Sequence, residues 1–496
     1  MFFSKSKYCL MRQCPKLLWL DTYHKELKTE DPSRDERMAV GNEIGDLAMG
    51  LFGDFTEVTV LKDDDRPDIS AMLQQTQDCL RRGVENICEA SFSYKGLYCA
   101  VDILHKERGG YAIYEVKSST HAQPIYGVDV AYQKYVLEHC GVKVTGTYLV
   151  CLDPAYVRGE ELDIHALFQI IDLAEAVSAE YPLIQSRLSQ AEDVLAQHNE
   201  PARELGEHCE DPYHCPYWEY CTRHLPSPSV FDLYRMPFKK KLSYYHAGMR
   251  SYSQLLDAPK LNDKQQRQIQ FQLHDCGVHI DKDGIRKFLS TLSYPLYFLD
   301  FETMQQALPQ YCGTKPYQQV PFQYSLHYIE GEGAPLQHKE FLAKEGTDPR
   351  RAIAESLCRD IPKDVCVTAY NKSFECSRLA ELAEQFPDLA EHLLNIRDNV
   401  RDLLVPFQSG FYYNRAMGGS FSIKSVLPAL FPDDPALDYH NLEGVHNGAE
   451  AMTVFPLLQQ MPPQQRQEVR RQLLAYCKLD TFAMVKVWQA LAEAAK

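Results

Sequence analysis

The sequence predicts a mixed α/β protein with two domains and a basic segment between them. The chain has 496 residues, more than one hydrophobic core usually organises, so two or three folding units are expected. Strand-like and helix-like periodicities alternate over residues 90–152 and again over residues 296–491. A stretch rich in Pro and Ser at residues 225–229 punctuates the chain between these two regions.

The first region predicts a three-stranded meander followed by a helix and a further strand. The strands are expected at 90–94, 97–104 and 111–117, because apolar residues there alternate or run continuously. Lys95-Gly96 and Arg108-Gly109-Gly110 supply the turns between them. The helix is expected at about 125–139 and the next strand at 142–152.

The last region repeats the alternation of strands and helices, which favours a mixed sheet. Strands are expected at 296–302, 322–329 and 365–370, and helices at about 348–358, 373–386 and 464–491. The predicted domains are therefore residues 1–222 and 293–496, with residues 223–292 as a basic linker.

Composition excludes some classes of protein. Hydrophobic residues make up 45% of the chain, and no run approaches the about 20 apolar residues that a membrane span needs. The N-terminal stretch has basic residues and leucines but no small-residue cleavage site after them, so secretion is not expected. We expect a cytoplasmic protein whose 16 cysteines are core thiols or metal ligands before they are disulfides.

The first group of functional candidates lies on the meander and the helix after it. Glu115 and Lys117 are two apart on one strand and so share a sheet face, and Asp102 can meet them across the hairpin. Carboxylates beside a lysine suit metal-assisted phosphodiester hydrolysis: the acids hold Mg²⁺ or Mn²⁺, and the lysine positions or deprotonates the attacking water. A surface salt bridge is the alternative. The complete set is Glu89, Asp102, Glu115, Lys117 and Gln133.

These residues carry a family resemblance. The segments ending in Asp102, running through Glu115-Val-Lys117, and spanning 129–133 resemble the RecB-like branch of the PD-(D/E)XK nucleases, whose fold is restriction-endonuclease-like. The resemblance covers residues 1 to about 222 and implies that the acids bind metal and that Lys117 and Gln133 complete the catalytic site. A histidine common on the first helix of relatives is absent here, where Glu43 stands in the comparable stretch.

A second group of candidates is formed by cysteines. Cys209, Cys215 and Cys221 are spaced six apart, twice, in a segment full of Pro, Tyr and His, which favours coordination over packing. Three thiolates leave a tetrahedral or cubane site one ligand short. RecB-like nucleases with an iron-sulfur cluster supply one cysteine from before the nuclease core, and Cys14 fits that position, with Cys9 as its rival. The resemblance implies a [4Fe-4S] cluster; zinc and unligated thiols are the alternatives.

A third group of candidates lies in the last region. Asp300 and Glu302 project from one face of a predicted strand, and adjacent acids repel unless cations bind between them. Tyr476 and Asp480 are four apart in a helical pattern and so lie on one helix face. Metal binding therefore explains the group better than scattered surface acids do.

The third group resembles the DnaQ-like DEDD exonucleases of the tyrosine subclass, which have an RNase H-like fold and act 3′ to 5′. The residues that carry the resemblance are the Asp300-x-Glu302 motif, the stretch 371–375, the serine-rich stretch 420–424, and Tyr476-x-x-x-Asp480. Glu375 stands where the family carries Asp, so both Glu375 and Asp402 are candidates for the fourth metal ligand.

The segment between the domains reverses the charge of the chain. Residues 222–292 hold 12 Lys and Arg against 6 Asp and Glu, whereas the formal charge of the whole chain is −16. Lys239, Lys240 and Lys241, with the stretch 244–250, resemble a single helix-hairpin-helix that binds phosphate. A solvated charge run beside an ordinary turn is the alternative.

Taken with the two resemblances, these features predict a metal-dependent nuclease with two active sites that acts on nucleic-acid ends, with DNA favoured over RNA. An RNA 3′ to 5′ exonuclease and a nucleic-acid-binding scaffold with one or both sites inactive are the competing hypotheses.

Overall fold

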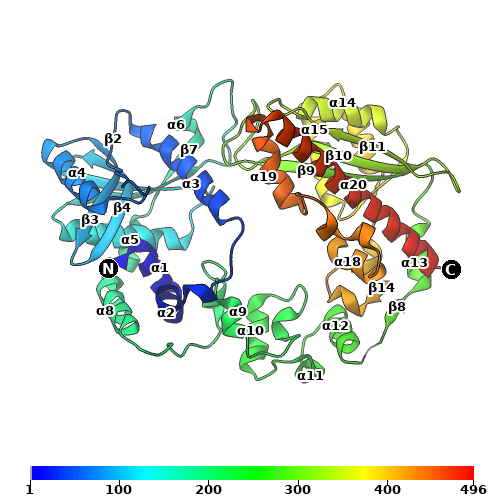
Figure 1. Cartoon of the computed structure of the whole chain (residues 1–496), viewed down its shortest axis with the longest axis horizontal. Helices are drawn as coiled ribbons and strands as arrows, with labels where there is room; N and C mark the ends of the chain where they lie inside the picture. Colours follow the sequence, from blue (N-terminus) through cyan, green and yellow to red (C-terminus); the bar gives the residue numbers. More distant parts are fainter. Residues whose placement is uncertain (1–2, 275) are drawn as a thin grey trace. The chain divides into compact units, whose positions relative to one another are not determined.

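The computed structural model of the chain describes residues 3–274 and 276–496 and divides into two compact units (Figure 1). The first unit runs to Leu225 and includes Gln306–Tyr317, and the second contains Pro226–Gln305 and Gln318–Lys496. Each unit has a mixed sheet covered by helices, which confirms the predicted α/β class. The division at residue 225 falls in the Pro- and Ser-containing stretch of the sequence.

A seven-stranded sheet forms the centre of the first unit. Its strand order is β2-β3-β4-β5-β6-β7, with β1 paired in parallel to β4. The bounds are β1 (Phe3–Ser4), β2 (Thr56–Glu57), β3 (Asn86–Tyr94), β4 (Leu97–Glu107), β5 (Gly110–Lys117), β6 (Val144–Leu152) and β7 (Phe168–Asp172). The predicted meander is thus present, and the turn at Lys95-Gly96 has the positive φ angles of a tight hairpin, 48° and 85°.

Helices cover both faces of this sheet. The largest apolar core lies on the face covered by α1 and α5, and a second core lies beneath α3 on the other face. Strand β5 is buried from both sides, so the polar groups that it carries are held in a low-dielectric setting. The helices of this unit are α1 (Lys5–Gln13), α2 (Pro15–Tyr23), α3 (Arg34–Ala48), α4 (Ile69–Arg82), α5 (Pro124–His139), α6 (Ile164–Leu167), α7 (Ala174–Glu180), α8 (Ile184–Leu195) and α9 (Trp218–Thr222).

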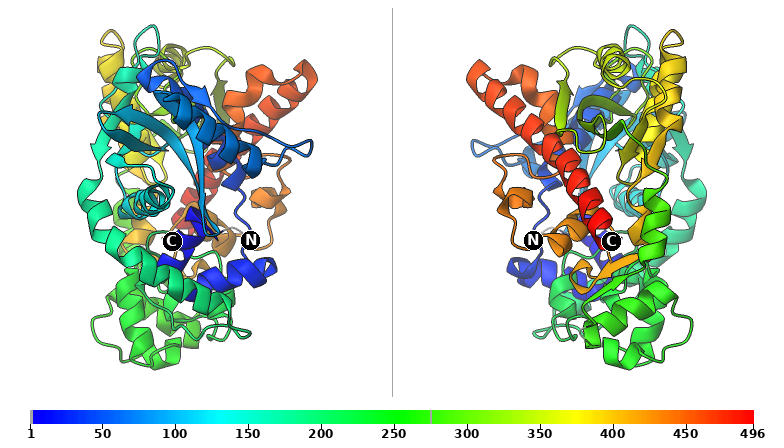
Figure 2. Two further views of the ribbon diagram at one scale, coloured as in Figure 1. Left: turned by 90° about the vertical axis from the view of Figure 1, so that its left-hand side faces the viewer. Right: turned by 90° about the vertical axis from the view of Figure 1, so that its right-hand side faces the viewer.

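The second unit is built on a five-stranded sheet of order β11-β10-β9-β12-β13. Its central strand β9 pairs antiparallel with β10 and parallel with β12, and the 32-residue helix α20 packs across β9 and β10 (Figures 1 and 2). The strands are β9 (Leu296–Gln305), β10 (Gln319–Ile329), β11 (Gln337–Leu342), β12 (Cys366–Ala369) and β13 (Val400–Asp402). The helices are α14 (Arg350–Asp360), α15 (Ser373–Gln385), α16 (Ala390–Asp398), α17 (Val405–Gln408), α18 (Ile423–Leu430), α19 (Gly448–Leu457) and α20 (Pro463–Ala494).

The segment expected to be a basic linker is folded, and from Pro226 onwards it belongs to the second unit. Its strand β8 pairs with β14 in a two-stranded ribbon. The second helix of the expected helix-hairpin-helix, α11, is only four residues long. The elements are α10 (Phe238–His246), α11 (Tyr252–Leu255), α12 (Asp263–His274), β8 (Val278–Ile280), α13 (Lys282–Leu289) and β14 (Tyr412–Asn414).

Within the part of the chain that the structure describes, no helix combines the length and the apolar character needed to cross a membrane.

Candidate functional site

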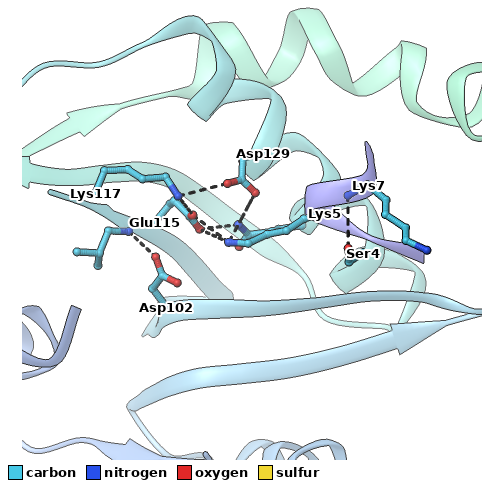
Figure 3. Close-up of polar contacts among 9 residues, drawn as sticks. Ser4, Lys5, Lys7, Asp102, Glu115, Lys117 and Asp129 are labelled. Carbon is cyan, nitrogen blue, oxygen red and sulfur yellow. Dashed lines mark hydrogen bonds and ion pairs between the residues drawn. The ribbon is translucent and has the colours of Figure 1, made fainter. Parts of the chain in front are cut away.

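The first acidic group gathers around Glu115 in the middle of β5 (Figure 3). The Glu115 side chain is 0% exposed, and Lys117, on the same strand, forms an ion pair with it. Asp102 on β4 accepts the backbone N–H of Val116 at 2.6 Å. Gln133 on α5 donates from Nε2 to Oε2 of Glu115 at 2.6 Å. Four of the five predicted residues are therefore brought together.

Glu89, the fifth predicted residue, lies beside this group on β3. The pairing of β3 with β4 skips Glu89 and Asp102, although Cys88 pairs with Ile103 and Ala90 with Val101. Glu89 has a φ of 56°, a left-handed conformation that is costly for a residue with a Cβ. The carboxylate of Glu89 is close enough to Asp102 that the charge of Asp102 adds to the effect of burial in raising the pKa of Glu89. Glu43, in contrast, is exposed on α3.

Two further residues of this site were missed by sequence reasoning. Nζ of Lys5, at the start of α1, lies 2.9 Å from Oε1 of Glu115 and 3.7 Å from Oδ1 of Asp129 (Figure 3). Oδ2 of Asp129 also lies 3.4 Å from Nζ of Lys117. Asp129 could have been identified, because it precedes Gln133 by one helical turn. Lys5 is 110 residues away from Glu115 along the chain, and no local pattern marks it.

Burial and charge divide the acids of this site into two kinds. Burial, reinforced by the charge of Glu115, raises the pKa of Asp102 to about 6. Burial and the charge of Asp102 raise the pKa of Glu89 to about 7. Burial alone would also raise the pKa of Glu115, but the ammonium groups of Lys117 and Lys5 hold it well below its usual range. Glu115 is therefore ionised and already neutralised by the protein itself.

A cavity of about 240 Å³ opens beside these groups. Lys5, Lys117 and Asp129 line one part of it, and Tyr213, which is 52% exposed, lines another. Cys9, the alternative to Cys14 as the fourth cysteine ligand, also lines this cavity and so lies at the acidic site.

The four predicted cysteine ligands come together elsewhere in the first unit. They line one small cavity of about 20 Å³, together with His208. Backbone contacts hold the loop in place: the N–H of Cys215 donates to the carbonyl of Cys209 at 2.8 Å. Gln13, which precedes the first ligand, donates to the carbonyl oxygens of His208 and Tyr213. The ligand set is Cys14, Cys209, Cys215 and Cys221, all with free thiols.

The spacing of these thiols bears on the group that they could hold. Among the described residues, no three of these sulfur atoms lie within 4.8 Å of one another. A tetrahedral zinc site requires sulfur atoms about 3.8 Å apart, given Zn–S bonds of about 2.3 Å. A cubane separates its ligands further, because each sulfur binds a different iron. The four thiols are a donor set that either an iron-sulfur cluster or a zinc ion could use. His214 is exposed and pairs with Glu210 instead.

The second acidic group lies in the second unit, on β9 and α20. Oxygens of Asp300 and Glu302 and the sulfur of Cys477 lie within 4.8 Å of one another. Asp480, one turn after Tyr476 on α20, accepts a hydrogen bond from the hydroxyl of Tyr439 at 2.7 Å. Among the described residues, the other oxygen of Asp480 has no hydrogen-bond partner although it is buried. An unpartnered buried oxygen of this kind is suited to a cation.

The first turn of α19 lies against this site. Gly448 is the first residue of α19. A Cβ at that position would lie 3.5 Å from Oε2 of Glu302 and 4.0 Å from the hydroxyl of Tyr476. The Glu302 carboxylate and the Tyr476 phenol are therefore neighbours, as the sequence prediction requires.

The structure distinguishes the two candidates for the fourth ligand. Glu375 on α15 is buried, its charge contributes to the raised pKa of Asp300, and its Oε2 has no hydrogen-bond partner among the described residues. Asp402 instead accepts backbone N–H groups of Asn371, Lys372 and Leu404, at 2.9, 3.2 and 3.0 Å. Asp402 therefore fixes the turn before α15, whereas Glu375 is the candidate with a buried carboxylate oxygen that accepts no hydrogen bond from the described residues.

All four carboxylates of this group hold protons more tightly than free acids do. Burial, with mutual repulsion among the acids, raises the pKa values of Asp300 and Glu302 well above their usual range. Burial raises the pKa of Asp480 to about 6 and that of Glu375 to about 8. Lys424 on α18 is the cation that lowers the pKa of Glu302 and Asp480, and it lies over the rings of Tyr439 and Tyr476.

A larger cavity, of about 800 Å³, opens beside Lys424 and Tyr439. His440, His446 and Asn447 also line it. It is large enough to hold a nucleotide-sized ligand next to the acidic group.

The three lysines of α10 do not share one surface. Lys239 is exposed, whereas Lys241 is half-buried and donates to the carbonyl of Phe231 at 2.6 Å. Lys240 reaches the carbonyl of Lys260 and lies over the ring of Tyr244. Of the three, Lys239 is the one whose placement most suits a phosphate contact.

Comparison with known proteins adds a family and two relatives. A family described as "Domain of unknown function (DUF2779)" matches residues 297–422, which include Asp300, Glu302 and Glu375 but end before α20. "Uncharacterized protein MG366 homolog" of Mycoplasma pneumoniae is 27% identical over 231 residues, 42% of this chain and 34% of the relative. "Uncharacterized protein MG366" of Mycoplasma genitalium is 25% identical over 209 residues, 38% of this chain and 31% of the relative. The chain thus spans about a third of the length of these relatives, whose names state no activity.

Proposed function

We propose that the chain is a metal-dependent nuclease with two active sites, and that it hydrolyses phosphodiester bonds at nucleic-acid ends. DNA is the favoured substrate. The observation that carries the proposal is the second acidic group, in which Asp300, Glu302, Glu375 and Asp480 are buried together with raised pKa values. Such acids ionise together only when cations bind among them.

In the second unit, the residues support a 3′ to 5′ exonuclease. The four carboxylates would hold Mg²⁺ or Mn²⁺, which supply a Lewis acid and an activated water. Tyr476 stays a neutral phenol, since burial and the neighbouring acids raise its pKa well above the usual range. Its hydroxyl, beside Glu302, can therefore orient an attacking water by hydrogen bonding but cannot act as a base. Lys424 lies where it can offset the negative charge of a phosphate.

In the first unit, Asp102 and Glu115 would hold the same kind of cation, with Glu89 as an additional carboxylate. Gln133 fixes one oxygen of Glu115, which leaves the orientation of that carboxylate defined. Lys117, positioned by Glu115 and Asp129, would orient the attacking water or the phosphate. Burial lowers and the surrounding acids raise the pKa of Lys117, and the net effect is a raised value. Lys117 is therefore a positively charged donor rather than a base.

The cysteine group would serve a structural purpose in this enzyme. It joins the end of α1, near the N-terminus, to the loop before α9, near residue 221. A [4Fe-4S] cluster would close this long loop and stabilise the first unit without redox turnover.

Digestion of end-labelled substrates tests the proposal. Single-stranded DNA, duplex DNA and RNA are incubated with the protein and Mg²⁺ or Mn²⁺, with EDTA as the metal-free control. We expect mononucleotides that disappear in Asp300→Asn and persist in Asp283→Asn, an exposed acid of α13 in the same unit. Release of mononucleotides by Asp300→Asn at the wild-type rate would refute the assignment of the second site, and preferential digestion of RNA would establish the RNA exonuclease instead.

A scaffold function is the second candidate, and one observation favours it for the first unit. Both oxygens of Glu115 are already engaged, by Lys5, Lys117 and Gln133. An ion-pair network of this kind can be purely structural. If the first unit is a scaffold, Lys117→Ala will leave every cleavage product unchanged while nucleic-acid binding persists; if it is a nuclease, a subset of products will disappear.

A further inference from the structure

Lys5 links the N-terminal segment of the chain to the first acidic group. Its Nζ lies 2.9 and 3.2 Å from the two oxygens of Glu115 and 3.7 Å from Asp129. Glu115 is thus held between two lysines, Lys5 from α1 and Lys117 from β5 (Figure 3). The two ammonium groups approach Glu115 from different elements, so they are independent parts of the site.

The backbone around Lys5 is firmly fixed. Phe3 and Ser4 pair with Leu97 and Tyr98 at the start of β4, the strand that carries Asp102. The hydroxyl of Tyr132 on α5 donates to the carbonyl of Phe3 at 2.5 Å. The side chain of Ser4 caps α1. A paired strand and a capped helix therefore fix the position of Lys5 at the site.

The side chain of Lys5 also reaches the cavity of the first unit. It is 24% exposed and lines the 240 Å³ cavity, whereas Glu115 is fully buried. A flexible four-carbon stem allows the ammonium group to turn from a buried carboxylate towards a ligand in the cavity. A compact positive charge there is suited to a phosphate.

We propose that Lys5 is a further active-site residue of the first unit, which neutralises Glu115 and Asp129 in the free protein and binds a substrate phosphate once Glu115 binds a divalent cation. The inference rests on the proposed nuclease function of this site and adds to it a second lysine from outside the strand motif. It also accounts for the salt-bridged state of Glu115: the pairing with Lys5 is a resting state, so an engaged Glu115 does not imply an inactive site.

This role predicts opposite effects on two binding reactions. Lys5 competes with a divalent cation for Glu115, so its removal strengthens cation binding. Lys5 attracts a phosphate, so its removal weakens substrate binding. A residue that merely supported the fold would weaken both, because loss of the local structure would disorder the carboxylates and the cavity together.

Binding measurements on full-length protein test the proposal. All variants carry Asp300→Asn so that the second site does not obscure the result. Mn²⁺ binding is measured by calorimetry, and binding of a short single-stranded oligonucleotide with phosphorothioate linkages is measured by fluorescence anisotropy in Ca²⁺. We expect Lys5→Met to bind Mn²⁺ about tenfold more tightly and the oligonucleotide about tenfold more weakly, since one unit charge near a partly buried site has an effect of that order.

Two further variants control for folding and chemistry. Lys7→Met removes a lysine of the same helix whose side chain points away from the carboxylates in Figure 3, and it should change neither affinity. Lys5→Arg keeps the charge and should restore oligonucleotide binding. A thermal scan identifies any variant whose first unit unfolds at a lower temperature than in the wild type. If Lys5→Met is such a variant, the Mn²⁺ and oligonucleotide affinities of Lys5→Arg, which preserves the ion pair, decide the test.

The outcomes are distinct. Unchanged or weaker Mn²⁺ binding in Lys5→Met would overturn the proposal, and so would unchanged oligonucleotide binding. If the wild-type protein cleaves no substrate, the nuclease function of the site fails, but the Mn²⁺ measurement still decides whether Lys5 holds the carboxylates in the free protein.

Discussion

The two acidic groups of this protein use similar residues but are neutralised in different ways. In the first unit, Glu115 and Asp129 are paired with Lys5 and Lys117, and the pKa of Glu115 lies well below its usual range. In the second unit, Asp300 and Glu302 face Asp480 and Glu375, and their pKa values lie well above the usual range. The first group is paired with two lysines, whereas acids dominate the surroundings of the second, where Lys424 lowers the pKa of Glu302 and Asp480.

The difference shows that a cluster of acids by itself does not define a metal site; what surrounds the acids decides how they behave. Where lysines converge, the acids stabilise the fold in the absence of metal. Where acids face one another, they destabilise the metal-free fold unless they take up protons. The two units should therefore respond in opposite directions to the same substitution, pH change and metal ion.

The largest expected effect is on the activity of the second site. Asp300→Asn removes one negative ligand from the centre of the group while keeping its size. We expect divalent-ion-dependent release of mononucleotides to fall by about a thousandfold, equivalent to about 4 kcal/mol of transition-state stabilisation. Single-turnover digestion of labelled DNA measures the effect, with Asp283→Asn as the control. A residual rate within tenfold of the wild type would contradict the assignment.

Stability should distinguish the units by the sign of the change. Glu115→Gln leaves Lys5 and Lys117 with Asp129 as their remaining ion-pair partner, so we expect the first unit to lose about 3 kcal/mol. Glu302→Gln relieves repulsion among buried acids, so we expect the metal-free second unit to gain about 1 kcal/mol at pH 8. Calorimetry combined with hydrogen exchange of each unit checks both values. Stability changes of the same sign in the two units would contradict this difference between them.

Removal of the iron-sulfur cluster from the four cysteines should lower the stability of the first unit alone. We expect anaerobically purified protein to be brown and to contain iron, and Cys215→Ala to lose the iron and about 2 to 5 kcal/mol from the first unit, by analogy with other covalent cross-links. Cleavage that depends on Asp300 should continue.

Cys9→Ala is the matched control for iron content, because Cys9 lies in the other cavity. Loss of iron in Cys9→Ala but not in Cys14→Ala would reverse the choice between the two cysteines. Stoichiometric zinc with no iron would overturn the assignment of an iron-sulfur cluster.

The pH dependence of metal binding follows from the raised pKa values of the second group. Asp480 and Glu375 have pKa values of about 6 and about 8, and each must lose its proton to bind a cation. Mn²⁺ affinity of the second unit should therefore rise with pH up to about 8, by up to tenfold per pH unit for each proton released.

Stability of the metal-free second unit should change in the opposite direction. The folded carboxyl groups keep protons that the unfolded chain has already lost above pH of about 4. Raising the pH from about 4 to about 8 therefore destabilises the metal-free unit, and Mg²⁺ restores the lost stability. Thermal scans with and without Mg²⁺ across this range test the sign; an increase in metal-free stability with pH would contradict it. Glu115 behaves conversely, since its lowered pKa contributes stability that is lost as the pH falls below about 4.

The smallest expected effect concerns the lysines of α10. Because Lys240 and Lys241 contact backbone carbonyls, only part of the charge of Lys239, Lys240 and Lys241 is available to nucleic acid. Reversing all three to Glu should weaken binding of every sequence alike and reduce the slope of log affinity against log salt by about 1, the effect of one phosphate contact. A sequence-dependent loss would contradict a purely electrostatic contact.

Much of the fold could be predicted because its signals are local. The hairpin at Lys95-Gly96, the helix before His139 and the apolar strand ending in Asp300 all depend on periodicity and turn residues within about ten positions. The grouping of Tyr476 with Asp480 on one helix face is local in the same way. The segment at 223–292 was harder, because its elements are short and are held by packing, as in the ribbon that β8 forms with β14.

The sequence by itself identified the candidate residues: the acids on β4, β5 and β9, the spaced cysteines, and the phenol and acid of α20. Tertiary structure decided which of them act together. It placed Cys14 beside the other three cysteines, engaged Asp402 with backbone N–H groups, and brought Lys5 across 110 positions to Glu115. The physical reason is that the type of a side chain sets its charge and its possible ligands, whereas its pKa and its partners depend on burial and on charges from distant segments, which only the folded chain brings within a few ångströms.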